Sequence, residues 1–179
     1  ISLYGVLQGM AMPFILLPSA ITGSIAVMLL PEVAAADASN EYEKLNRTVQ
    51  KVIKYTIGLG VFFGVIFVFG GKKIGSIVYH DSYSGEFISI LGWLCPFMYV
   101  STTLGSVLNG LGKTKETFIY NVIAVSIRLL FILFFIPAFG ISGYMWGFLV
   151  SEILLTILHY SKVQRFLSLK ARLKNSTLS

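Results

Sequence analysis

Two charged residues, Arg128 and Glu152, lie inside long apolar runs of this sequence. At about 1.5 Å per helical residue, Arg128 is roughly 16 Å into segment 117–136, and Glu152 is roughly 15 Å into segment 142–161 from the opposite side. The short connection PAFGIS predicts that the two segments are antiparallel neighbours, so that the charges are level. Charged residues at this depth usually face a partner, a substrate or an ion path.

The pair has two possible roles. A guanidinium can engage two phosphate oxygens at once, so Arg128 is a candidate for binding an anionic substrate group. Glu152 would then hold the arginine in place or compete for it as a gate. The alternative is a permanent ion pair that only satisfies two buried charges, and the sequence leaves both roles open.

Three further polar residues could take part. Asn109 and Asn121 lie near the ends of apolar segments, where they could donate hydrogen bonds to a sugar or join helices, and we favour the joining role. His159 is interpreted as an interfacial anchor rather than a proton relay. No group of side chains has metal-ligand spacing, and the glycines before Lys113 lack the phosphate-loop pattern. We therefore expect no metal and no cofactor.

The elements that carry these residues are predicted from composition. Of the 179 residues, 55% are hydrophobic and 12% charged, whereas about a quarter of a soluble domain is charged. Five segments approach the roughly 20 residues that span a bilayer core: 9–33, 52–70, 87–109, 117–136 and 142–161. We predict an all-α, polytopic transmembrane bundle over residues 1–165, with an interfacial helix at 41–51 and a basic tail at 166–179. Prolines should kink the first span.

The distribution of Lys and Arg predicts the orientation of the bundle. One side of the predicted spans carries only Lys72 and Lys73. The other side carries the remaining cations outside the membrane: Lys44, Arg47, Lys51, Lys54, Lys113, Lys115, Lys162, Arg165, Lys170, Arg172 and Lys174. Positive loops concentrate in the cytosol, so we expect a cell-membrane protein with a cytoplasmic C-terminal tail. The net charge of +6 forms no continuous basic face, which argues against nucleic acid.

Two stretches resemble a known family. These are PFILLPSAITGSIAVMLLPEVAAA and LNGLGKTKETFIYNVIAVSIRLLFILFFIPAFGISGYMWG, within a resemblance that covers residues 3–165. They look like the C-terminal part of polysaccharide-export flippases, in the stage V sporulation protein B branch of the multidrug/oligosaccharidyl-lipid/polysaccharide exporter superfamily. The resemblance implies a partial lobe of a two-lobe transporter that exposes a lipid-pyrophosphate-linked sugar to either face by alternating access.

The expected function is therefore flipping of a polyprenyl-pyrophosphate-linked saccharide for cell-envelope, spore or polysaccharide biosynthesis. The implied partners are the lipid bilayer, the substrate and a missing N-terminal lobe, and the implied substrate-binding residues are Arg128, Glu152, Asn109 and Asn121. One alternative is a cation-coupled multidrug exporter, which would need several membrane carboxylates. An intramembrane enzyme would need paired carboxylates or a His-rich motif, and we find neither and expect no catalytic residue. A non-transporting structural subunit is the remaining alternative.

Overall fold

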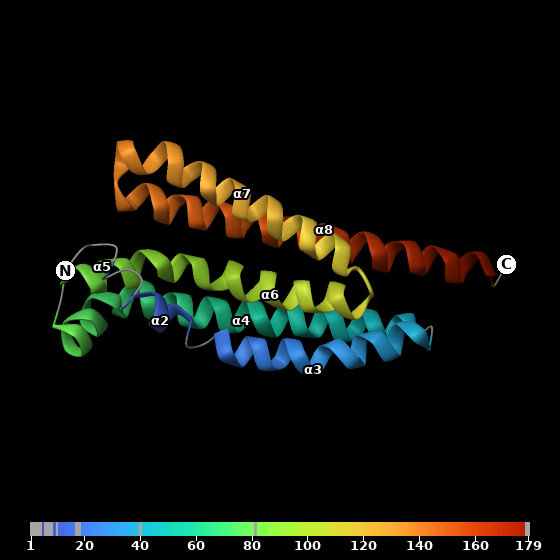
Figure 1. Cartoon of the computed structure of the whole chain (residues 1–179). Helices are drawn as coiled ribbons and strands as arrows, with labels where there is room; N and C mark the ends of the chain where they lie inside the picture. The colour runs from blue at the N-terminus through green and yellow to red at the C-terminus, as the bar shows by residue number, and fades with distance from the viewer. Residues whose placement is uncertain are drawn as a thin grey trace.

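A computed structural model describes residues 5, 9, 11–16, 19–39, 41–80 and 82–177, and these residues form helices without strands. The elements in chain order are α2 (Met12–Leu16), α3 (Ser19–Ala38), α4 (Tyr42–Ile74), the π-helical turn η2 (Gly75–Tyr79), α5 (Ser82–Leu91), the 3₁₀ turn η3 (Gly92–Leu94), α6 (Cys95–Gly110), α7 (Thr114–Phe139) and α8 (Ile141–Thr177) (Figure 1). The all-α fold expected from the sequence is confirmed.

Helix α6 is the centre of the bundle. It packs against α3 and α4 on one side and against α8 on the other, while α7 and α8 form an antiparallel hairpin (Figure 1). Gly140 ends α7 with a positive φ of 58°, and one residue later α8 begins. The hairpin predicted from the short PAFGIS connection is therefore present, with this glycine making the turn.

Four helical stretches among the described residues are long and apolar enough to cross a bilayer: Ala20–Ala38, Tyr42–Val78, Gly85–Gly110 and Thr114–Phe139. This confirms a polytopic membrane bundle. The expected fifth span, 142–161, forms the first part of α8 and lies along α7. Its crossing of the membrane stays a prediction.

Helix boundaries differ from the expected ones at three places. The expected interfacial helix at 41–51 is the beginning of α4, a single helix of 33 residues, and the tail continues α8 to Thr177. Pro31 lies inside α3 without ending it, while Pro18 and Asn40 lie outside the described residues. Helical hydrogen bonds continue where the hydropathy changes, because both water and lipid tolerate a helix.

Glycines allow α4 and α6 to approach closely. A Cβ at Gly60 would lie 2.5 Å from the Pro96 Cα atom, and a Cβ at Gly64 would lie 3.0 Å from the Gly92 carbonyl oxygen. Gly60 and Gly64 form a G-x-x-x-G, a spacing that favours close helix contact in apolar helices. The contact brings backbone against backbone and fixes α4 and α6 as one unit.

The far end of α8 is anchored to the same unit. Val163 and Leu167 pack in a buried cluster with Val33 of α3, Leu45 of α4 and residues of α6. At this end Lys170 pairs with Asp37 of α3, and Lys162 pairs with Glu116 of α7 at 3.1 Å. The second half of α8 therefore closes one end of the bundle.

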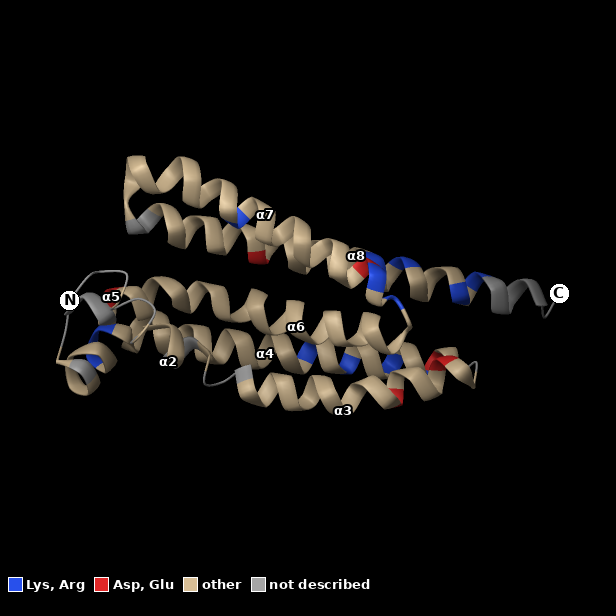
Figure 2. Cartoon of the chain, in the orientation of Figure 1, with Lys and Arg blue, Asp and Glu red and all other residues tan. Residues whose placement is uncertain are grey.

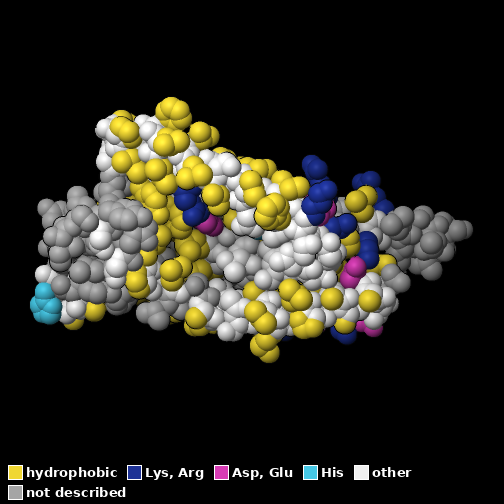
Figure 3. Space-filling model, viewed as in Figure 1, with side chains coloured by type: hydrophobic (Ala, Val, Ile, Leu, Met, Phe, Trp, Pro, Cys, Tyr) yellow, Lys and Arg dark blue, Asp and Glu magenta, His cyan; other side chains and the backbone are white. Residues whose placement is uncertain are grey.

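The outer surface divides into an apolar region and a basic end. Hydrophobic side chains cover much of the α7–α8 hairpin on the face that Figure 3 shows. Lys and Arg gather toward the end where α7 begins and α8 continues (Figure 2). This arrangement is typical of a helix bundle whose apolar surface contacts lipid.

We predict that a methyl group at Gly60 destabilises the bundle, whereas one at Gly58 does not. The Gly60 Cβ would collide with the Pro96 backbone, but a Cβ at Gly58 meets nothing within 4 Å. We expect Gly60→Ala to lower the free energy of unfolding by about 1–3 kcal/mol, measured by denaturation in detergent. Gly58→Ala should leave it equal or higher, because alanine favours helix. Equal stabilities would contradict the close α4–α6 contact.

Candidate functional site

The structure brings Arg128 and Glu152 together. The Arg128 Nη2 atom lies 2.9 Å from the Glu152 Oε1 atom, which joins α7 to α8. Arg128 also donates from Nε and Nη2 to the Ser151 hydroxyl, each at 3.2 Å. Its guanidinium carbon lies 3.9 Å from the centre of the Phe148 ring. The arginine is thus held by a carboxylate, a hydroxyl and an aromatic face.

The second carboxylate oxygen of Glu152 links the hairpin to α6. The Ser101 hydroxyl donates to Glu152 Oε2 at 3.1 Å. Glu152 is 8% exposed, so its charge is largely removed from solvent. A buried carboxylate is tolerated only where paired and hydrogen-bonded, and here both of its oxygens have partners from different helices.

A polar hollow of about 320 Å³ lies beside the carboxylate. It is formed by α6, α7 and α8, and its polar lining includes Ser101, Ser106, Asn109, Asn121, Glu152 and His159. Three of the four predicted substrate-binding residues, Glu152, Asn109 and Asn121, therefore share one hollow. Arg128 is not part of its lining and reaches it through Glu152.

The two asparagines differ in their hydrogen bonding. Asn121 donates from Nδ2 to the Thr117 carbonyl at 2.8 Å, a bond within α7. The side chain of Asn109 makes no hydrogen bond within the described part of the chain, and the residue is half-buried at the hollow. The helix-joining role that we favoured is thus not seen for either side chain among the described contacts.

His159 is buried, so its interpretation as an interfacial anchor is wrong. Its ring is 2% exposed and lies between α6 and Tyr120 of α7, with ring centres of the two aromatics 5.9 Å apart. Its Nδ1 atom lies 3.1 Å from the Ser101 carbonyl, and a carbonyl only accepts, so Nδ1 carries a hydrogen. The Nε2 atom has no partner among the described residues. The hollow thus has one unsatisfied imidazole nitrogen in its wall.

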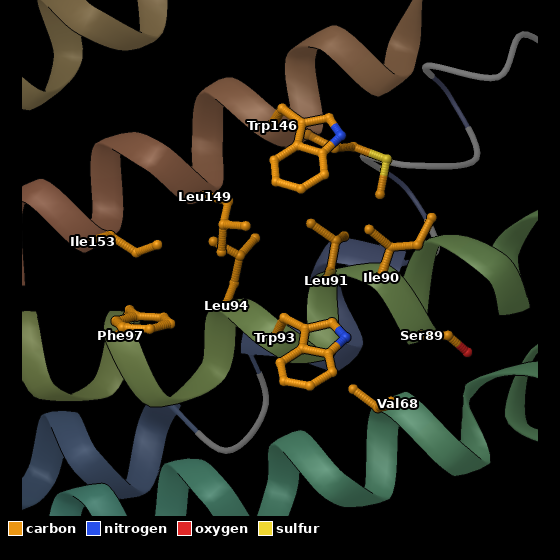
Figure 4. Close-up of a pocket in the computed structure, with 11 residues that line it drawn as sticks. Val68, Ser89, Ile90, Leu91, Trp93, Leu94, Phe97, Trp146, Leu149 and Ile153 are labelled. Atoms are coloured by element: carbon orange, nitrogen blue, oxygen red, sulfur yellow. The ribbon is translucent and has the colours of Figure 1, made fainter.

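A second, apolar hollow of about 540 Å³ is lined by residues of α4, α5, η3, α6 and α8. In Figure 4, Trp146, Leu149 and Ile153 of α8 face the segment that holds Leu91, Leu94 and Phe97. Along α8 the apolar lining ends at Ile153, and the polar lining begins at Glu152. The two hollows share no lining residue, but Glu152 and Ile153 are neighbours along α8.

The chemistry available here is binding. No group of three or more His, Cys, Asp or Glu side chains within the described ranges could hold a metal ion. Cys95 is a buried free thiol. The hollow combines hydroxyls, amides, a carboxylate and an imidazole, which suits a ligand rich in hydrogen-bonding groups.

Sequence reasoning missed Ser101, Ser151 and the burial of His159. A helical pattern could have pointed to His159, since it lies seven residues after Glu152 and thus on the same face of α8. Nothing local marks Ser101, because its contact with Glu152 joins residues 51 positions apart.

Comparison with known proteins gives the chain a family. The MatE family model matches residues 2–134. Sporulation protein YkvU of Bacillus subtilis (strain 168) is 27% identical over 177 residues, covering 97% of this chain and 40% of that protein. Stage V sporulation protein B of the same organism is 25% identical over 179 residues, covering 98% of this chain and 34% of that protein.

The chain spans less than half the length of these two relatives. No solved structure matches it. The family match covers well over half of the chain and agrees with the resemblance to the stage V sporulation protein B branch seen in the sequence. The chain belongs to the MatE family.

Proposed function

We propose that this chain is part of a membrane transporter that flips a polyprenyl-pyrophosphate-linked saccharide across the cytoplasmic membrane. The observation that carries the proposal is the seam between α6 and α8, where Glu152 lines a polar hollow and its neighbour Ile153 lines a separate apolar one. A lipid-linked saccharide has the same division, because an apolar chain is followed by a hydroxyl-rich head group.

The ion pair supplies a way to bind the anionic part of this substrate. Arg128 engages one oxygen of Glu152 and has the donor fork that suits phosphate. A pyrophosphate that reaches the guanidinium competes with Glu152 for the same donors. The displaced carboxylate can then accept hydrogen bonds from sugar hydroxyls in the adjoining hollow.

The same exchange would act as a gate. Glu152 ties α8 to both α6 and α7, so a ligand that replaces its partners loosens the seam. Binding energy is thereby used to separate helices, which alternating access requires. A permanent ion pair, the alternative, would hold the seam closed whether or not substrate is present.

The two Bacillus subtilis relatives are longer than this chain. The chain covers 40% and 34% of two relatives that are named as sporulation proteins. We propose that a further lobe of the same protein completes the cavity and that the saccharide serves spore or cell-envelope biosynthesis. In this proposal the basic end, including the extension of α8, lies in the cytosol.

Removing both charges of the pair tests its role. Arg128→Gln alone leaves a buried carboxylate unpaired and should cost about 3–5 kcal/mol of folding free energy. The double variant Arg128→Gln/Glu152→Gln keeps hydrogen-bonding groups without charge and should fold. We expect it to flip substrate roughly 10- to 100-fold more slowly, because a hydrogen bond to a charged group contributes about 1.5–3 kcal/mol.

The measurement is translocation of a fluorescent polyprenyl-pyrophosphate-linked saccharide in proteoliposomes, with thermal unfolding of the same preparations. Arg165→Gln, which removes an exposed arginine from the extension of α8, is the matched control and should transport normally. Full transport by a stable double variant would assign the ion pair a structural role alone.

Asn109 tests the polar hollow separately from the charges. Its amide has no partner in the described part of the chain, so Asn109→Ala should leave stability unchanged. Transport at low substrate concentration should fall about two- to tenfold, the effect of one ordinary hydrogen bond. Ser126→Ala on the exposed face of α7 is the control. Lower stability with unchanged transport would indicate a helix-joining role for Asn109.

Cysteine labelling tests the proposed orientation. Cys95 is fully buried and should not react with the label. Labelling of one cysteine introduced at either end of the bundle can therefore be measured. We expect a membrane-impermeant maleimide to label Lys72→Cys in intact cells and Lys115→Cys only after permeabilisation. The opposite result would reverse the assignment of the basic end to the cytosol.

A further inference from the structure

One exposed face of α4 changes from basic to apolar along its length. Arg47, Lys51 and Lys54 lie on this face, followed by Tyr55, Gly58 and Phe62, and all six residues are exposed. Their spacings of three, four and seven residues place them on one side of the helix. The opposite side packs against the bundle through Leu45, Val49, Ile53 and Gly60.

The cations of this face are not used by the fold. Lys44 pairs with Glu41, but Arg47, Lys51 and Lys54 have no carboxylate within 4.0 Å in the described part of the chain. They stand where a membrane-spanning stretch begins, and cations there attract the anionic head groups of lipids. These cations are therefore available to an anion from outside the chain.

The helix is hollowed directly beyond the cations. A shallow surface hollow of about 510 Å³ is lined by Lys51, Lys54, Tyr55, Gly58, Leu59 and Phe62. Gly58 supplies the depression, because a Cβ there would have nothing within 4 Å. Tyr55 and Phe62 are 63% and 60% exposed and form its walls. The hollow has a polar end with two ammonium groups and an apolar end with an aromatic ring.

The dimensions fit a lipid that stands in one leaflet. Phe62 lies eight residues beyond Lys54, about 12 Å along the helix, and one leaflet of the hydrocarbon core is about 15 Å thick. We infer that this face of α4 binds one anionic phospholipid of the bilayer, with its phosphate between Lys51 and Lys54 and an acyl chain over Gly58 against Phe62. The site goes beyond the proposed transport and lies on a different face from the seam between α6 and α8.

A protein occupant fits this face less well. A helix packed over Gly58 would cover two lysines that lack partners, and burying unpaired charges is costly. A phospholipid matches both halves, since its phosphate neutralises the cations and its chain covers the ring. The long lysine side chains can also extend toward the head-group level.

The test is lipid selectivity at the position of the acyl chain. The full-length protein that contains this chain, with Phe62→Trp, is reconstituted in equimolar phosphatidylcholine and phosphatidylglycerol, one of which carries brominated chains. Emission of the Phe62→Trp protein minus that of its parent reports which lipid lies against position 62. We expect brominated phosphatidylglycerol to quench more strongly, with a preference of about fivefold for each lysine.

Three variants separate a built site from general attraction. Lys51→Gln and Lys54→Gln should each reduce the preference about fivefold, whereas the control Lys72→Gln/Lys73→Gln, at the other end of the same helix, should not change it. Gly58→Leu keeps both lysines and fills the hollow, and should remove most of the preference.

Several results would overturn the inference. Equal quenching by the two lipids would mean that no anionic lipid is selected. A preference that survives Gly58→Leu would indicate only attraction to a charged surface. Absence of quenching by either lipid would mean that protein, from another lobe or a second copy, covers this face.

Discussion

The burial of a single carboxylate governs how the three helices around the seam pack. Glu152 has one oxygen on Arg128 of α7 and the other on Ser101 of α6. Loss of Arg128 would leave a largely buried charge unpaired, which costs several kcal/mol, and loss of Ser101 would leave the second carboxylate oxygen without its donor. The position of the hairpin relative to α6 is therefore specified by hydrogen bonds, while the apolar surfaces around it are much less selective.

Local patterns in the sequence were sufficient to predict the all-α fold and the ion pair between Arg128 and Glu152. Apolar runs of about 20 residues predict membrane helices, and the short turn at Gly140 makes α7 and α8 antiparallel, so Arg128 and Glu152 had to meet. The third member of the network was not predictable, because Ser101 depends on how α6 packs against α8. His159 was misinterpreted for a related reason. Its position near the end of an apolar run suggests an interface, but α8 continues to Thr177 and keeps that segment inside the bundle.

Helix ends were harder to predict than spans for a physical reason. Hydropathy marks where the surroundings change from water to lipid, whereas a helix ends only where its backbone hydrogen bonds end. Helix α4 passes from its basic beginning into its apolar stretch without a break. The exposed face that carries Lys51, Lys54 and Phe62 results from this continuity, since one straight helix holds both the cations and the ring in a single line.

The packing of the bundle differs from one interface to the next, and this difference indicates where motion is easiest. Gly60 brings α4 into backbone contact with α6, and Gly147 brings α8 so close to α7 that a Cβ there would lie 2.4 Å from the Phe131 Cβ. Such contacts leave no room for sliding, so each of these helix pairs behaves as a rigid unit. Between the two units lies the seam of α6 and α8, which holds the contact of Glu152 with Ser101 and contributes lining residues to both hollows. Polar partners can be exchanged for those of a ligand, whereas interlocked backbones cannot, so a conformational change driven by binding would separate the bundle along α6 and α8.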